Sequence, residues 1–112
     1  MIQKNYKKGV DKMNKKQKDF VERFVDGTIT FAQEAADRYS YYGFDYIDEL
    51  EDSLNDENIS YTEDEKQEMK KYIQNKLEEE YGYDNVWYGS SEQTMPIDGR
   101  IQTIHYQLVI RF

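Results

Sequence analysis

The sequence predicts an α+β fold, in which about four N-terminal helices pack on a small C-terminal antiparallel β-hairpin or three-stranded sheet. Apolar residues recur at helical intervals through residues 15–82, whereas they alternate with a period of two through residues 101–112. The chain has 112 residues, enough for one modest core, and its aromatic content of 15% is typical of a folded protein. We therefore expect a single domain over 1–112, with a disordered basic leader at 1–14, a helical acidic body at 15–82 and a β-rich part at 83–112.

Two glycines divide the first half of the helical body. A first helix is expected at about 15–26, because its apolar residues follow helical spacing and Gly27 supplies a stop signal. Thr30 and Gln33 then have the spacing of a capping box, which predicts a second helix that ends at Gly43. The apolar residues that define these two helices are Phe20, Val21, Phe24, Val25, Phe31, Ala32, Ala35, Ala36 and Tyr39.

A third helix is expected at about 44–56 and a fourth at about 63–81. Thr62 and Glu65 have the spacing of a second capping box, and Gly82 supplies the C-terminal stop of the fourth helix. The acids in its first turn suit the positive end of a helix dipole. The apolar stripes of the third and fourth helices consist of Tyr46, Ile47, Leu50, Leu54, Met69, Tyr72, Ile73 and Leu77.

The last quarter of the chain has the pattern of β-strands. A short strand is expected at 86–88, and the Asp98-Gly99 pair is a strong turn signal. A hairpin alone is marginally stable, so we expect the helices to cover one face of it. In the final strand, one alternating set of side chains is almost entirely apolar and is expected to face the core: Gln102, Ile104, Tyr106, Leu108, Ile110 and Phe112.

The net charge of −8 is unevenly distributed along the chain. Residues 1–18 carry a charge of +6, residues 19–84 carry −14, and residues 85–112 are neutral. A body of that charge repels nucleic acid and attracts basic surfaces, so we expect a basic protein partner and no direct nucleic-acid binding. No apolar run approaches the roughly 18 residues of a membrane span. Because cysteine is absent, disulfides and thiolate sites are excluded and an intracellular protein is expected.

Patterns for catalysis and metal binding are weak. His105 is the only histidine and lies in a predicted strand, so no Ser-His-Asp set is supported. Asp45, Asp48, Glu49 and Asp52 share one helical face, but the Asp-x-Asp-x-Asp-Gly calcium loop and a histidine partner are missing. A solvated acidic face is favoured over a metal site, and we expect neither an enzyme nor a cofactor.

The third helix and the tyrosines before it form the candidate binding surface. Carboxylates along a helix can replace phosphates against Arg and Lys, and tyrosines can serve as rigid anchors on which guanidinium groups stack. Tyr39, Tyr42 and Tyr46 can share one helical face, so Tyr41 is expected to point elsewhere, and residues 78–80 form a second acidic edge. The alternative is that the tyrosines complete a small core and the acids confer solubility. The expected partner-binding residues are Tyr41, Tyr42, Asp45, Tyr46, Asp48, Glu49, Glu51, Asp52 and Asp56.

In size, acidity, lack of cysteine, clustered tyrosines and acids, and low-GC composition, the chain resembles small anti-defence proteins of phages and mobile elements. These are the anti-CRISPR proteins and the DNA-mimic anti-restriction proteins, and the resemblance is one of class without a shared motif. It implies a stoichiometric inhibitor that binds the basic nucleic-acid-binding cleft of a guide-loaded CRISPR effector nuclease and blocks target DNA. Its location is then the cytoplasm of an infected or element-carrying low-GC bacterium.

Three other functions fit the same residues. One is an antitoxin or adaptor that neutralises another basic protein, and another is a phage structural or assembly component that self-associates. The third is a small metal-dependent hydrolase that uses the acidic cluster. An inhibitor acts near one-to-one and is indifferent to chelators, whereas an enzyme acts substoichiometrically and loses its activity with EDTA.

The start of the chain has two interpretations. Codons permitted by residues 8–13 include a bacterial ribosome-binding sequence at a suitable distance from an ATG. This predicts that Met13 is the natural start and that residues 1–12 are translated leader. The alternative is a native basic arm.

Overall fold

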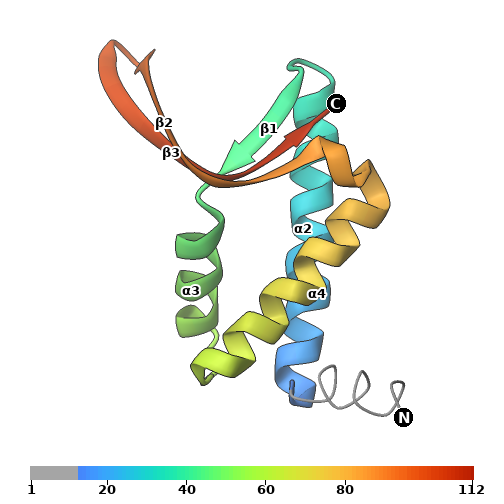
Figure 1. Cartoon of the computed structure of the whole chain (residues 1–112). Coiled ribbons are helices and arrows are strands. Elements are labelled where there is room, and N and C mark those ends of the chain that lie inside the picture. The colour runs from blue at the N-terminus through green and yellow to red at the C-terminus, as the bar shows by residue number, and fades with distance from the viewer. Residues whose placement is uncertain (1–12) are drawn as a thin grey trace.

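The structure of the chain is a computed structural model that describes residues 13–112. Its helices and strands confirm the α+β class (Figure 1). No helix in this described part of the chain is long and apolar enough to cross a membrane. The elements, in chain order, are α2 (Lys15–Ala36), β1 (Tyr41–Phe44), α3 (Tyr46–Asp56), α4 (Glu63–Tyr81), the short 3-10 helix η1 (Tyr83–Asn85), β2 (Val86–Ile97) and β3 (Arg100–Arg111).

Helix α2 is one continuous helix where the sequence predicts two. Gly27 lies in its interior, and the Thr30 hydroxyl donates to a backbone carbonyl one turn earlier (2.9 Å) instead of capping a new helix. The buried stripe runs across the glycine without a break, because Val25, Thr28 and Ala32 are all buried. Burial of that stripe outweighs the roughly 0.5–1 kcal/mol that an interior glycine costs. The prediction of about four helices was therefore wrong: residues 13–112 contain three α-helices and η1.

The segment Tyr41–Phe44 forms a strand, β1, that the sequence did not predict. It pairs antiparallel with β3, so that Tyr42 lies opposite Ile110, and the sheet has the strand order β1-β3-β2. Gly43 is not a helix stop but permits a close approach, because a Cβ at this position would lie 2.6 Å from the ring of Tyr106. The sheet thus draws one of its three strands from the middle of the chain.

Helices α3 and α4 correspond to the predicted third and fourth helices. Helix α4 has the predicted bounds and the predicted capping box. The Thr62 backbone N–H donates to Glu65 Oε1 at 2.8 Å, and the Glu65 backbone N–H donates to Thr62 Oγ1 at 3.1 Å. Helix α3 begins at Tyr46 rather than at residue 44, because β1 continues to Phe44.

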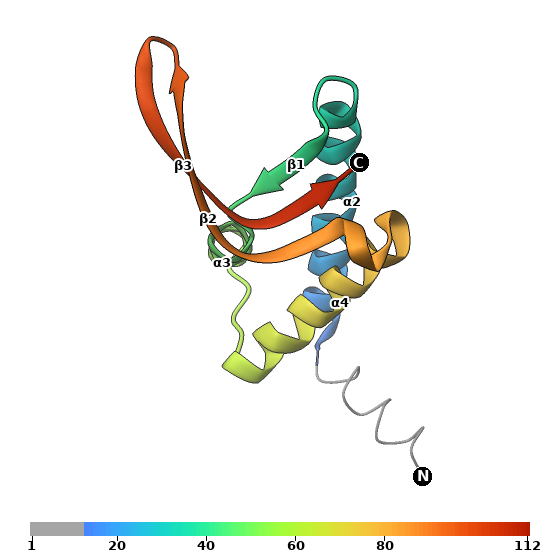
Figure 2. The same cartoon turned by 45° about the horizontal axis from the view of Figure 1, so that its top comes forward.

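The sheet reaches beyond the helices that cover it. In Figures 1 and 2 the helices lie on one side of the sheet, and the far half of β2 and β3 projects away as a two-stranded ribbon. Leu108 and Ile110 are buried in the core, as the alternation predicts. Tyr106 is also buried, but it packs against Tyr41, with ring centroids 6.0 Å apart, and lies outside the core cluster, so its assignment to the core was wrong. Gln102 and Phe112 are exposed and were wrongly assigned to the core, because Gln102 lies on the projecting ribbon and Phe112 follows the end of β3.

The start of the described chain is tied to the helices. Met13 and Asn14, which the sequence assigns to a disordered leader, have defined places. Met13 is only 5% exposed, and Asn14 forms a capping box with Gln17 at the start of α2. Gln17 is itself buried and donates to the backbone carbonyl of Ser60 at 3.1 Å. The rest of the predicted leader, residues 1–12, lies outside the described residues.

Candidate protein-binding face

Helix α3 is oriented by a buried stripe of three side chains. Tyr46, Leu50 and Leu54 are at most 1% exposed. The ring of Tyr46 packs against those of Phe24 and Phe44, with centroid separations of 6.2 and 6.0 Å. Each of these large side chains contributes about 1.5–3 kcal/mol on full burial, so together they determine which side of α3 faces solvent.

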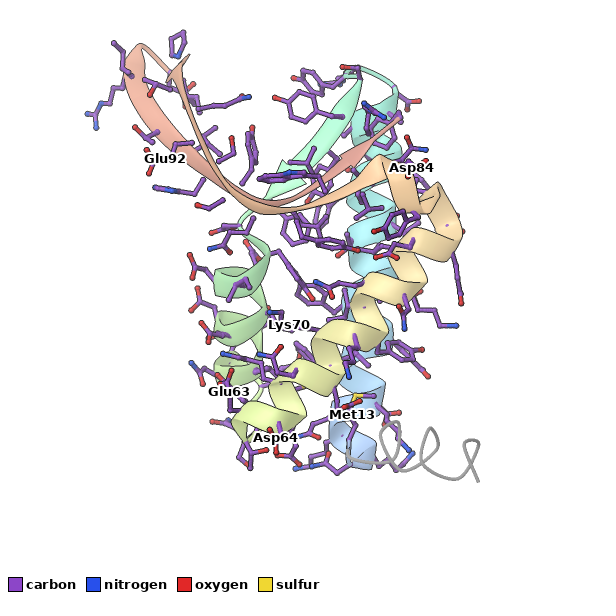
Figure 3. The ribbon with its side chains drawn as sticks, viewed as in Figure 1. Met13, Glu63, Asp64, Lys70, Asp84 and Glu92 are labelled. Atoms are coloured by element: carbon purple, nitrogen blue, oxygen red, sulfur yellow. The ribbon has the colours of Figure 1, made fainter. Side chains whose placement is uncertain are left out.

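The acids of α3 lie on the opposite side of the helix. At about 100° of rotation per residue, five carboxylates fall within an arc of about 100° that faces away from Leu54. Figure 3 shows oxygen-tipped side chains projecting from the outer side of α3, away from α2 and α4. We call this set the acidic stripe, and its members are Asp45, Asp48, Glu49, Asp52 and Asp56.

Glu51 was predicted to belong to this surface but points elsewhere. Its carboxylate pairs with Lys66 Nζ of α4 at 3.0 Å, and the same ammonium group contacts Glu63 at 3.2 Å. These two carboxylates raise the pKa of Lys66, because they favour its charged form. Glu51 therefore links α3 to α4 and is not part of the free acidic stripe.

The N-terminus of α3 is capped from the sheet. Gln107 of β3 accepts hydrogen bonds through Oε1 from the backbone N–H groups of Ile47 (2.7 Å) and Asp48 (3.3 Å). Asp45 occupies the N-cap position, but its side chain makes no capping hydrogen bond. The Asp45 carboxylate is thus left for the acidic stripe. Sequence reasoning missed Gln107, since a cap that lies 60 residues along the chain has no local signal.

The acidic stripe is not neutralised from within the described chain. Among residues 13–112, none of its members takes part in an ion pair. The pKa of Glu49 is raised, first by partial burial and then by the negative charges of Asp45 and Asp52. Mutual repulsion therefore adds to the cost of keeping these carboxylates charged side by side.

The helix dipole favours only part of the stripe. Asp48 and Glu49 lie in the first turn of α3, where negative charge is stabilising. Asp56 lies at the other end, and the last turn carries no basic residue. A carboxylate there opposes the dipole by about 0.3–1 kcal/mol at low ionic strength. The acidic stripe therefore extends to the C-terminal end of α3, where its charge lowers the stability of the helix.

The three predicted tyrosine anchors have separate environments. Tyr46 is a core residue, and burial removes it from any binding surface. Tyr42 is half-buried beside the stripe, and burial together with the charges of Glu49 and Asp45 raises its pKa. Tyr41 alternates to the other face of the sheet, where its hydroxyl donates to Gln93 at 3.2 Å. Of the three, only Tyr42 lies next to the acidic stripe.

A groove runs between α2, β1 and α3, alongside the acidic stripe. Its volume is about 410 Å³. Aromatic rings supply much of its surface, and Glu49 contributes a carboxylate from α3. Sequence reasoning did not find this groove, because it requires β1 to lie between the two helices. The lining residues are Arg23, Phe24, Gly27, Thr28, Phe31, Tyr42, Phe44, Glu49 and Ser53.

The described residues show no group of three or more His, Asp or Glu side chains arranged to hold a metal ion. His105 lies on the exposed ribbon, where its Nδ1 is 3.4 Å from a carboxylate oxygen of Glu92. Figure 3 shows Glu92 on the ribbon, far from the helices.

Comparisons of the chain with protein-family models, with curated proteins and with solved structures found no match.

Proposed function

We propose that the chain is a stoichiometric inhibitor that places the acidic stripe of α3 against the basic nucleic-acid-binding cleft of a host defence nuclease. Our preferred target is a guide-loaded CRISPR effector nuclease, whose target DNA the stripe would exclude. The observation that supports this proposal is a row of five carboxylates with no ion-pair partner among residues 13–112, continuing to the end of α3 where it opposes the helix dipole.

The average density of the charges supports mimicry of a nucleic-acid strand. Residues 45–56 extend about 18 Å at 1.5 Å per residue, so five carboxylates give on average roughly one charge per 3.6 Å, with individual steps of about 1.5–6 Å along the axis. One strand of B-DNA carries one charge per about 3.4 Å of helix axis. An arginine-rich cleft that binds phosphates can therefore meet carboxylates at a similar density, through charge-assisted hydrogen bonds.

A competition experiment with matched variants tests the proposal. Binding to purified effector nucleases from low-GC bacteria is measured at increasing salt, with and without guide RNA and target DNA. The stripe variant neutralises three exposed acids of α3: Asp48→Asn, Glu49→Gln and Asp52→Asn. The control variant neutralises three exposed acids elsewhere and changes the net charge equally: Asp19→Asn, Glu22→Gln and Asp84→Asn.

We expect one-to-one binding that weakens with salt, is lost once target DNA is loaded, and is unaffected by EDTA. The stripe variant should bind at least about tenfold more weakly, since each removed charge contact is worth on the order of 1 kcal/mol or more. The control variant should bind like the unmodified chain. Equal losses in both variants would show a general charge effect and contradict the assignment to α3. Inhibition that persists with target DNA bound would contradict mimicry, and binding only to a different basic protein would favour an antitoxin or adaptor.

A further inference from the structure

Gly27 occupies a position that the fold does not explain. It lies in the interior of α2, where glycine is less stable than alanine because it loses more backbone freedom on folding. Its backbone has no positive φ, and a Cβ built on it would meet nothing within 4 Å. An alanine would therefore fit the free protein without strain. The missing side chain instead leaves open space in the groove between α2, β1 and α3.

The side chains around this open space have the chemistry of a guanidinium site. Phe24 and Phe31 lie about one turn to either side of Gly27 on the same face of α2. Phe31 is 59% exposed, so its ring is available to a ligand in the groove. Glu49 and Tyr42 line the groove from α3 and β1. Aromatic faces beside a carboxylate suit arginine, which stacks its planar group and donates bidentate hydrogen bonds.

The groove's own arginine does not serve as this group. Arg23 lines the groove, but its guanidinium is paired with Glu57. Glu49, in contrast, has no ion-pair partner within the described chain. Its carboxylate is the negative group that faces this groove from α3.

The groove also continues along α2. A second hollow of about 440 Å³ shares Phe31 and Tyr42 with the first and extends to Tyr39, which is 64% exposed. Its lining carries two acids, Glu34 and Asp37, and one base, Arg38. The two hollows together offer more room than one side chain fills, and their acids outnumber their bases by three to two, which fits a short basic peptide segment.

We infer that the groove at Gly27 receives an arginine side chain from a basic segment of a partner protein. This deepens the proposed function, on which it rests for the identity of the partner but not for the chemistry of the site. The glycine leaves room for the guanidinium, Phe31 and Tyr42 stack on its two faces, and Glu49 pairs with its charge. Phe24, which packs against Phe20, Phe44 and Tyr46, forms the floor of the site.

The test uses three eight-residue peptides that differ only at a central pair of residues: arginine, lysine or the neutral isostere citrulline. Binding to the full chain is followed by ¹H–¹⁵N NMR. We expect the arginine peptide to shift the backbone signals of residues near Gly27, Phe31 and Tyr42, with lysine weaker and citrulline weakest. Shifts confined to α4 or the ribbon, or equal binding of citrulline, would overturn the inference.

Substitutions separate the slot from general stability. Gly27→Ala should raise the melting temperature while weakening the arginine peptide about tenfold, a combination that a purely structural glycine does not produce. Phe31→Ala should weaken the peptide similarly, whereas Ile101→Ala, which truncates a 78% exposed side chain on the ribbon, should not. Unchanged peptide affinity in Gly27→Ala would exclude the slot.

The outcomes also distinguish this inference from the proposed function. If the arginine peptide shifts the signals around Gly27 but no effector nuclease binds the chain, the arginine site is supported and the nuclease target is contradicted. If a nuclease binds equally well to Gly27→Ala and the arginine peptide leaves the slot unshifted, the slot falls and the inhibitor proposal stands.

Discussion

Helices α3 and α4 are both acidic and amphipathic, but they differ in how many of their acids form ion pairs within the chain. Helix α4 carries four lysines, and three of its seven acids pair with a lysine one turn away: Glu63 with Lys66, Glu68 with Lys71 and Glu79 with Lys76. Helix α3 has no basic residue at all, and five of the acids on or next to it have no ion-pair partner in the described chain. The two helices therefore differ in how far their own lysines offset their acids, since α4 carries four lysines against seven acids and α3 carries none against five.

The difference distinguishes acids whose charge is balanced by an ion pair within the fold from acids whose charge remains available to a binding partner. Ion pairs between residues i and i+3 stabilise a helix by about 0.2–0.5 kcal/mol, and each pair offsets the charge of its acid. Like charges on adjacent turns lower helix stability by a similar amount, and their charge is not offset. We therefore expect partner binding on α3, and α4 supplies the matched comparison.

The largest expected effect tests whether α3 is as firmly packed as α4. Leu54→Ala and Leu77→Ala remove side chains that are both fully buried, from α3 and α4 respectively. Each should lower the free energy of unfolding by about 2–5 kcal/mol, through lost burial and the cavity left behind. Urea denaturation measures both. A loss below about 1 kcal/mol for Leu54→Ala alone would mean that α3 is loosely attached and the stripe is not rigidly presented.

The next effect concerns the cap that the sheet provides to α3. Gln107→Ala removes the acceptor for two backbone N–H groups and should cost about 1 kcal/mol, the usual value of a helix cap. Gln102→Ala, on the exposed ribbon, is the matched control and should change stability by less than about 0.5 kcal/mol. Thermal unfolding of the two variants gives the comparison. Equal stability of both would contradict a capping role for Gln107.

Features of the fold that depend on residues close together in the sequence could be predicted, whereas features that depend on distant residues could not. Helix α4 was predicted at its observed bounds because its capping box, apolar stripe and terminal glycine are all local. The acids of α3 were likewise predicted to share a solvent-facing side, since helical periodicity alone sets that side.

What the sequence did not predict depends on contacts between distant segments. Gly27 and Gly43 look alike as helix stops, but one lies within α2 and the other gives β1 room beneath Tyr106. Strand β1 is too short to show alternation and is defined by its pairing with β3. The groove and the cap by Gln107 follow from that pairing, so local patterns in the chain do not reveal them.

A smaller effect sharpens the contrast between the two helices. Asp56→Asn removes a carboxylate at the unfavourable end of the α3 dipole and should raise stability by about 0.3–1 kcal/mol at low salt. Glu79→Gln on α4 breaks the pair with Lys76 and should leave stability unchanged or slightly lower. Both differences should shrink in high salt, because exposed charges are screened. Destabilisation by Asp56→Asn would indicate that this charge serves the fold, and unfolding measured at two salt concentrations detects it.

The smallest effect is a pH dependence with opposite signs in the two helices. The folded pKa of Glu49 is raised above its ordinary value of 4.5, so the charged side chain destabilises the fold above the raised pKa. Glu49→Gln should therefore increase stability at pH 7 by a few tenths of a kcal/mol, the size of a like-charge pair on adjacent turns. This gain should disappear as the pH falls through the raised pKa and below 4.5, where the carboxyl group is protonated in both states.

The pKa of Glu65 in α4 is lowered by hydrogen bonding to Thr62, so its charge stabilises the fold above pH 4.5 and that contribution is lost as the pH falls through the lowered pKa. Glu65→Gln should thus lower stability at pH 7, and a pH series of urea midpoints in which both variants shifted in the same direction would contradict the distinction between a carboxylate crowded by like charges and one held by a capping hydrogen bond.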